Sequence, residues 1–325
     1  MRSVVRAAFD IGSGATKLAV ARVTVERGAP FARVDEILFS EQRAVHLRAS
    51  MLKSGADTCL GEEIVRECAS VLCEFKGTAE ELGATEFHAI ATSVFRTAKN
   101  ADEVMRVIEE ALGFTPLIIP HHEEAILGFQ SAVAAAHAAG IKIDADAPLS
   151  PGLLSWDSGG GSFQISDGKH FFGAEIGSAK ATAMLLEIQG RKDSPNPTTM
   201  EHLDALRQEL AASLPAIPKW LCCHNAPKRV IAIGESTCAF RMCSLATGEN
   251  AFTSGQLRDS LKSIVGMDDS TFVRLGYSQP NTVCPKICLV LAVMEHLFPT
   301  TLPVRYLSTN GATLGMLTAS TWPTT

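Results

Sequence analysis

Two glycine-rich hairpins, each preceded by an aspartate, carry the residue types best suited to phosphate chemistry in this sequence. Asp10 precedes Gly12-Ser13-Gly14, and Asp157 precedes Gly159-Gly160-Gly161. Because glycine has no side chain to block a ligand, such turns can present backbone N–H groups to phosphate oxygens. An aspartate at the entrance can hold a divalent cation directly or through water.

The two hairpins repeat one pattern at a spacing of 147 residues, with Asp10 aligned on Asp157 and Gly12 on Gly159. In each copy an apolar stretch precedes the loop, and a second stretch and a turn follow it. A single hairpin of this kind is typical of an ordinary turn. Two copies with the same leading aspartate indicate an internal duplication, with one copy opening each of two domains. The pair favours a phosphate group with Mg²⁺ as the ligand, held between the domains.

The common nucleotide and metal motifs do not fit these residues. Gly12 to Lys17 lacks the Gly-Lys-Ser/Thr ending of a P-loop, and neither glycine cluster completes GxGxxG ahead of a helix. The run His121–Glu124 resembles a metal site, but it lacks the HExxH spacing that places two histidines on one helical face. A helix start that favours acidic residues is the alternative interpretation of this run.

Hydrophobic periodicity predicts the elements that position these residues. Amphipathic spacing predicts helices over 61–82 and 101–112, and an alanine-rich segment predicts a helix over 123–138. Residues 185–228 carry little recognisable signal. Apolar and β-branched stretches predict strands, the first three forming an antiparallel meander. The expected strands run over 4–9, 18–23, 31–39, 87–92, 117–120, 153–156, 162–166 and 170–175.

A chain of 325 residues is long enough for two domains at roughly 150 residues each. Gly140, two aspartates, Pro148, Pro151 and Gly152 give 140–152 the composition of a linker. We therefore expect domains at 1–139 and 140–325, with a last helix that can pack back on the first domain.

The net charge of the chain limits the classes of partner that we expect it to bind. With 29 basic and 35 acidic residues, the formal net charge is −6, so the broad positive field of a nucleic-acid-coating protein is missing. A local phosphate site needs only a few backbone amides and an arginine. Apolar runs are far shorter than the roughly 20 residues of a membrane span, so we expect no membrane-spanning helix. Arg6 interrupts the first apolar run, so we expect no signal peptide at residues 1–6. Nine cysteines without zinc or disulfide spacing indicate reduced thiols, and we expect a cytoplasmic protein.

Several short motifs occur in order along most of the chain, and the ordered set is more specific than any one of them. The motifs are Phe9-Asp10-Ile11-Gly12-Ser13, Arg43–Leu47, Ala91–Arg96 with Lys99-Asn100, Glu123–Leu127, Asp157–Ser162 and Glu175–Ser178. This set resembles the exopolyphosphatase/guanosine pentaphosphate phosphohydrolase (Ppx/GppA) family, within the superfamily of actin, sugar kinases and heat-shock ATPases. The resemblance implies an α/β fold of two actin-like (ribonuclease H-like) domains, each a mixed five-stranded sheet flanked by helices, with the active cleft between them.

The resemblance also implies residue roles. The residues around Arg96, taken alone, favour a surface arginine that caps a helix. The resemblance instead favours a phosphate contact, because Arg96 matches the family arginine that has this role. Glu124 matches the general base that takes a proton from the attacking water, and Glu123 ranks second. Mg²⁺ or another divalent cation is the implied cofactor, with Asp10 and Asp157 as its ligands. The implied phosphate-binding residues are Gly12, Ser13, Gly14, Arg96, Gly159, Gly160, Gly161, Ser162 and Gln164.

The chain departs from the family pattern at several positions. Gln164 stands where the family usually has glutamate, and an amide offers neither negative charge for Mg²⁺ nor basicity. Gly14 replaces a common asparagine, and Thr313 stands where the family tends to place arginine. Glu235 adds a negative charge beside Ser236, in a loop that resembles another phosphate-side loop. These changes together indicate weaker polyanion binding.

Three functions are compatible with these patterns. The first is Mg²⁺-assisted hydrolysis of a terminal phosphate of inorganic polyphosphate or guanosine pentaphosphate, and the acidic chain favours a nucleotide or short chain over long polyphosphate. The second is a regulatory protein of the same fold that binds phosphate or nucleotide but has lost turnover, as Gln164 suggests. A sugar or acetate kinase fits the motifs at 91–96 and 123–127 less well. The resemblance also allows a homodimer, and we expect neither nucleic acid nor membrane as a partner.

Overall fold

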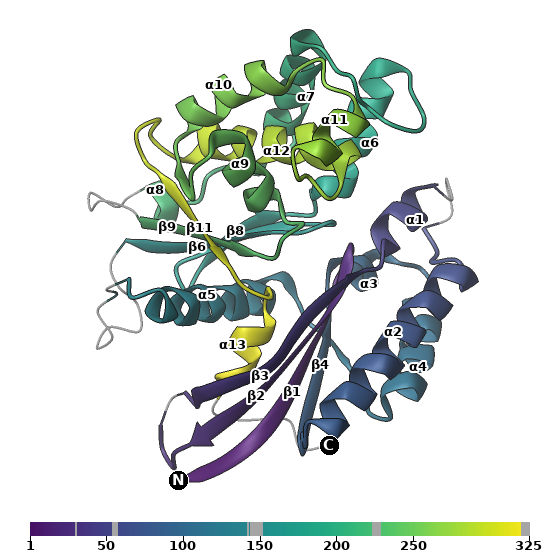
Figure 1. Ribbon diagram of the computed structural model, residues 1–325, viewed down its shortest axis with the longest axis vertical. Helices are drawn as coiled ribbons and strands as arrows, with labels where there is room; N and C mark the ends of the chain where they lie inside the picture. Colours follow the sequence, from purple (N-terminus) through teal and green to yellow (C-terminus); the bar gives the residue numbers. More distant parts are fainter. Residues whose placement is uncertain (30, 54–57, 142, 144–151, 223–228, 320–325) are drawn as a thin grey trace. The chain divides into compact units, whose positions relative to one another are not determined.

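The structure is a computed structural model that describes residues 1–29, 31–53, 58–141, 143, 152–222 and 229–319 (Figure 1). The chain divides into two compact units, Met1–Ala134 with Thr309–Thr325, and Ala135–Ser308. Each unit is built on one mixed sheet with helices packed against it, so the expected α/β class is confirmed. Pro148 and Pro151 of the expected linker lie outside the described residues.

The sheet of the first unit has the strand order β3-β2-β1-β4-β5. Its first three strands form the predicted antiparallel meander, while β4 and β5 run parallel to β1. The third strand extends well past the expected end, because its pairing with β2 continues as far as Ala15 opposite Ala44. The strands are β1 (Arg2–Ile11), β2 (Ala15–Val25), β3 (Arg33–Ala44), β4 (Glu86–Ala91) and β5 (Leu117–Ile118).

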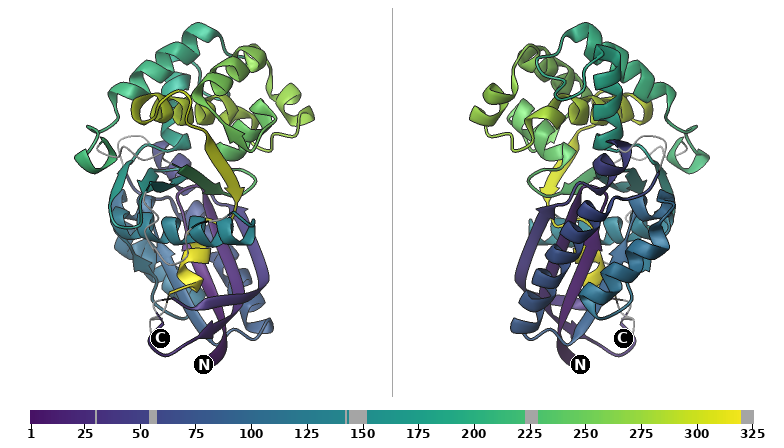
Figure 2. Two further views of the ribbon diagram at one scale, coloured as in Figure 1. Left: turned by 90° about the vertical axis from the view of Figure 1, so that its left-hand side faces the viewer. Right: turned by 90° about the vertical axis from the view of Figure 1, so that its right-hand side faces the viewer.

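Helices cover both faces of this sheet because its central strands are apolar on both sides. On one face, Phe9 and Ile11 pack against α2 (Glu62–Glu81) and α4 (Ala101–Leu112). On the other, Val4 and Ala8 pack against α13 (Thr313–Leu317). Figure 2 shows this short yellow helix beside the strands of the first unit. The alternation follows the pleat, which turns successive side chains to opposite faces. The remaining helices that begin in this unit are α1 (Leu47–Lys53), α3 (Ser93–Thr97) and α5 (His121–Ala138).

The sheet of the second unit has six strands in the order β10-β11-β9-β6-β7-β8, one more than expected. The added strand is β10 (Ala251–Phe252), a two-residue edge strand too short to leave a periodic signal in the sequence. As in the first unit, three antiparallel strands are followed by parallel ones, here β9 and β11, while β10 is antiparallel to β11. The other strands are β6 (Leu153–Ser158), β7 (Phe163–Ser166), β8 (Phe171–Ala174), β9 (Arg229–Gly234) and β11 (Val304–Ser308).

Several helices pack against one face of the second sheet. The most buried of them is α12 (Val283–Leu297), in which every side chain from Val283 to Met294 is buried. A helix that is buried on all sides belongs to the core of its domain. No helix within the described residues is long and apolar enough to cross a membrane. The other helices are α6 (Ser178–Gln189), α7 (Met200–Ala212), α8 (Lys219–Cys222), α9 (Ala239–Thr247), α10 (Ser254–Ile264) and α11 (Asp269–Arg274).

The buried side chain of Arg6 links the C-terminal end of α13 to the first sheet. Arg6 of β1 forms an ion pair with Glu86, with 2.8 Å between Nε and Oε2. Its Nη1 donates to the carbonyl oxygens of Leu317 (3.2 Å) and Ala319 (2.7 Å), at the end of α13. Arg6 therefore neutralises a carboxylate and caps a helix end in one place.

We predict that Arg6→Met lowers the free energy of unfolding by about 3 kcal/mol, because Glu86 loses its buried partner and the two carbonyls lose their donor. Arg2→Met is the matched control. Arg2 pairs with the same carboxylate at 2.9 Å, but its side chain is 68% exposed, so its loss costs less than about 1 kcal/mol. Urea unfolding measures both variants, and equal losses would contradict this assignment.

Candidate active site

The first hairpin places Asp10 directly opposite Lys17. The two residues are register partners in β1 and β2, and Lys17 Nζ lies 2.8 Å from Asp10 Oδ2. Gly311, with φ +58°, lies close by, and a Cβ atom there would come within 2.3 Å of Lys17 Nζ. The carboxylate of Asp10 is therefore buried, and its charge is already balanced by an ammonium group.

Backbone hydrogen bonds hold the loop between β1 and β2 in a fixed shape. Gly12 N donates to Ala15 O at 3.0 Å, and the carbonyl of Ser13 accepts from Arg48 N at 2.9 Å. The hydroxyl of Ser13 is buried and has no hydrogen-bond partner among the described residues. Buried polar atoms are seldom left without a partner, so this hydroxyl is a candidate donor to a ligand oxygen.

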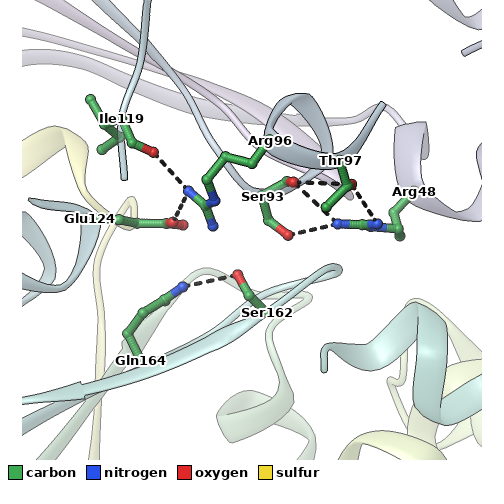
Figure 3. A network of polar contacts seen from close by, with 8 residues as sticks. All are labelled: Arg48, Ser93, Arg96, Thr97, Ile119, Glu124, Ser162 and Gln164. Carbon is green, nitrogen blue, oxygen red and sulfur yellow. Dashed lines mark hydrogen bonds and ion pairs between the residues drawn. The ribbon is translucent and has the colours of Figure 1, made fainter. Parts of the chain in front are cut away.

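The second hairpin repeats this geometry with different charge. Gly159 N donates to Ser162 O at 2.9 Å, which corresponds to the bond from Gly12 N to Ala15 O in the first loop. Gln164 is the register partner of Asp157, so it occupies the position that Lys17 has in the first copy. Its side chain is buried and donates from Nε2 to Ser162 Oγ at 2.9 Å (Figure 3). Thus one aspartate faces a cation and the other faces a neutral amide.

The start of α6 determines the shape of the triple-glycine loop. Ser178 N donates to Gly159 O (3.1 Å), and Ala179 N donates to Gly160 O (3.0 Å). The chain just before α6 lies so close to the loop that a Cβ atom on Gly177 would come within 2.4 Å of the carbonyl carbon of Gly160. Only glycine fits this contact, because both sides of it are backbone.

Arg96 and Glu124 lie together although the sequence separates them by 28 residues. Arg96 Nη1 lies 2.8 Å from Glu124 Oε2 and donates to Ile119 O at 2.9 Å, as drawn in Figure 3. The two side chains are only 15% and 12% exposed, whereas the side chain of Glu123 is 54% exposed and lies near His122. The helix α5 begins at His121, so that Glu124 lies in its first turn. The site thus combines an arginine suited to phosphate with a carboxylate suited to accept a proton.

Asp10 and Asp157 are the carboxylates predicted to bind a divalent cation. Within the described part of the chain, no group of three or more histidines, cysteines or carboxylates is placed to hold a metal ion. Mg²⁺ does not require one, since it is commonly bound by one or two carboxylates together with substrate phosphates and water. Asp157 lies opposite the neutral Gln164 in the strand register. The charge of Asp10 is balanced by Lys17 in this structure.

Sequence reasoning did not identify Lys17, Arg48 or Lys286. Lys286 lies in the apolar helix α12 and is buried, and its Nζ donates to Thr237 O (2.6 Å) and Gln279 Oε1 (2.7 Å). Burial lowers the pKa of Lys286 to about 8. Through its hydrogen bond to Thr237 O, Lys286 supports the loop after β9. The sequence of this loop resembles a phosphate-side loop. Only an unexpected charge within an apolar run could have indicated it.

The cysteines within the described residues form no disulfide, as expected. Two of them are not candidate nucleophiles. Burial raises the pKa of Cys68 and of Cys238 to about 11, so both thiols are protonated at neutral pH. Cys73, on α2, is exposed, and its Sγ donates to Ala111 O. Thr313, at the position of the family arginine, is buried and donates to Asn310 O at 2.7 Å.

Comparisons with known proteins agree with the motifs and the fold. A sequence model of the Ppx/GppA phosphatase family matches residues 29–306. An uncharacterized protein of Streptomyces coelicolor is 26% identical over 260 residues, which are 77% of this chain and 69% of that protein. Among solved structures, an exopolyphosphatase-like protein has a TM-score of 0.74 at 20% identity, covering 98% of this chain and 97% of its own. An exopolyphosphatase from Cytophaga hutchinsonii has a TM-score of 0.70 at 17% identity, covering 96% of each chain. These structures confirm the actin-like two-domain fold.

We predict that Gly177→Ala weakens phosphate binding at least tenfold, because the added Cβ forces the triple-glycine loop to move. Isothermal titration with pyrophosphate measures the affinity. Gly255→Ala in α10 is the matched control, since a Cβ there meets nothing closer than 3.9 Å. An unchanged affinity in Gly177→Ala, with the fold intact by circular dichroism, would exclude this loop from the binding site.

Proposed function

The chain belongs to the Ppx/GppA phosphatase family, and from this premise we propose that it hydrolyses the terminal phosphate of inorganic polyphosphate or guanosine pentaphosphate. The observation that carries the proposal is the ion pair between Arg96 and Glu124. It joins a phosphate-binding group and a proton acceptor at one place, on two elements whose sequences match the family motifs.

In the proposed reaction, a water oxygen attacks the terminal phosphorus and forms a new P–O bond. The bond from that phosphorus to the bridging oxygen breaks, and the shortened substrate leaves with that oxygen. Glu124 takes the proton from the attacking water. Arg96 binds the phosphoryl oxygens through its planar fork, and its engagement there releases Glu124 from the ion pair. Positioning and charge neutralisation supply most of the rate in phosphoryl transfer, so little covalent chemistry is needed.

The hairpin loops are the proposed phosphate-binding elements of each unit. In the first, the N–H groups of the loop and the Ser13 hydroxyl can donate to phosphate oxygens; in the second, the loop Gly159–Gly161 and Ser162 can do so. Asp10 and Asp157 are the proposed carboxylate ligands of a divalent cation. Such a cation, when bound with the substrate, neutralises phosphate charge. At Asp10 the cation would compete with the ammonium group of Lys17.

The net charge of the chain favours a short phosphate substrate over a long one. A long polyphosphate needs an extended positive surface, whereas the formal net charge here is −6. We therefore propose a short polyphosphate or a phosphorylated guanine nucleotide, and a cytoplasmic location that suits reduced thiols.

One observation favours a second function, a phosphate- or nucleotide-binding regulator without turnover. Gln164 uses its amide to donate to Ser162, so the second hairpin carries a neutral hydrogen bond where the family usually has a carboxylate. The loop keeps its shape while losing one negative charge, which preserves binding and weakens activation of a hydrated cation.

We predict that Glu124→Gln lowers phosphate release at least 100-fold, because an amide cannot accept the proton. Release from polyphosphate, guanosine pentaphosphate and ATP is measured with and without Mg²⁺. Glu123→Gln, which changes an exposed neighbour in the same helical turn, is expected to lose less than tenfold. The reverse order would move the base to Glu123. Tight binding of one substrate with no release from any would refute hydrolysis and leave the regulatory function.

We predict that Gln164→Glu raises Mg²⁺-dependent phosphate release tenfold or more, since the new carboxylate restores a negative charge opposite Asp157. Gln164→Met, of similar size and no charge, controls for the loss of the bond to Ser162 and is expected to give no gain. Rates measured over a series of Mg²⁺ concentrations distinguish tighter cation binding from faster turnover. No gain in Gln164→Glu would show that Gln164 does not limit the rate.

A further inference from the structure

Arg48 connects the first phosphate loop with the short helix that carries Arg96. Its backbone N–H donates to Ser13 O at 2.9 Å, within the loop. Its guanidinium reaches α3 at both ends: Nη1 donates to Thr97 Oγ1 (2.9 Å), and Nη2 donates to Ser93 Oγ (2.9 Å) and Ser93 O (3.2 Å). Figure 3 shows the contacts of the guanidinium with Ser93 and Thr97 beside the pair of Arg96 and Glu124. One residue therefore contacts two parts of the proposed site.

The helix α3 needs support of this kind. It has five residues, and the side chain of its N-cap residue, Thr92, makes no capping hydrogen bond. So short a helix is not stable by itself, because helix formation becomes favourable only over many more residues. Arg96 projects from this helix to reach Ile119 O and Glu124, so any rotation of α3 would displace its guanidinium.

We propose that Arg48 is a positioning residue that holds α3 so that Arg96 meets the substrate phosphate in register with the first loop. The inference rests on the proposed function and deepens it, since it names what orients the phosphate-binding arginine. Arg48 acts through α3 because both terminal nitrogens of its guanidinium donate to that helix. Lysine cannot replace it fully, since one ammonium group cannot span both ends of α3 as a planar fork does.

A double-mutant cycle tests this inference. We expect Arg48→Met to lower kcat/KM about 10- to 100-fold, the range in which a misplaced catalytic group reduces rates. In the background of Arg96→Met the same change is expected to cost less than about twofold, because its effect passes through Arg96. Arg48→Lys is expected to recover part of the rate. Arg66→Met, which removes an exposed arginine paired with Glu62 on α2, is the control and should leave the rate unchanged.

The cycle distinguishes positioning from the alternatives. If Arg48→Met costs the same factor with and without Arg96, Arg48 acts independently of Arg96 and the proposal is wrong. Should Arg48→Met fail to fold, Thr97→Val serves instead, because it removes a single acceptor of the clamp with little change in volume. It is expected to give a smaller loss that likewise disappears in the Arg96→Met background. Persistence of that loss would overturn the proposal.

A second readout does not depend on activity. In spectra of arginine side-chain N–H groups, the Arg96 Nε–H signal is assigned by its absence in Arg96→Met. We expect this signal to shift or broaden in Arg48→Met and to stay unchanged in Arg66→Met. An unchanged Arg96 signal in Arg48→Met would refute the positioning role. Absence of phosphate release from the unmodified protein, with the signal shifted as expected, would refute the proposed function alone.

Discussion

The register of the two antiparallel hairpins determines what each leading aspartate faces, and most of the candidate site depends on it. Pairing Asp10 with Lys17, and Asp157 with Gln164, places the partner on the same face of the sheet at the mouth of a tight loop. A shift of one residue would turn both side chains to the opposite face. The loop bonds, from Gly12 to Ala15 and from Gly159 to Ser162, close only in this register. Two loops of the same backbone shape thus differ chiefly in charge.

That difference in charge distinguishes the two halves of the duplication. In the first hairpin the ammonium of Lys17 makes the mouth of the loop electrically balanced, so phosphate oxygens meet little repulsion from Asp10. In the second hairpin the register partner of Asp157 is the neutral Gln164. The two copies of the hairpin therefore present different side-chain charges beside their leading aspartates.

Much of the fold could be predicted from the sequence, because its elements have strong local signals. The amphipathic spacing of α2, the valine-rich strands and the repeated aspartate-glycine loops each depend on residues close in the chain. The helix α7 was missed although Leu203, Leu206 and Leu210 are buried along one face, since the polar residues between them mask the pattern. The contact of Arg96 with Glu124, and that of Arg48 with α3, depend on where separate elements pack. The family motifs indicated a role for Arg96 and for Glu124 but not the contact between them, and nothing in the sequence indicated the contact of Arg48.

The position of α13 has a consequence for how the chain is made. Its residues cover Val4, Ala8 and Val23, which belong to the strands synthesised first. On a ribosome that adds roughly 5–20 residues per second, α13 is completed on the order of tens of seconds after those strands. During that interval one apolar face of the first sheet is not covered by α13. The guanidinium of Arg6 also lacks its two acceptors, the carbonyls of Leu317 and Ala319. The first unit therefore cannot complete its apolar core until the second unit has been synthesised and α13 has left the ribosome. During this delay, binding by chaperones competes with folding.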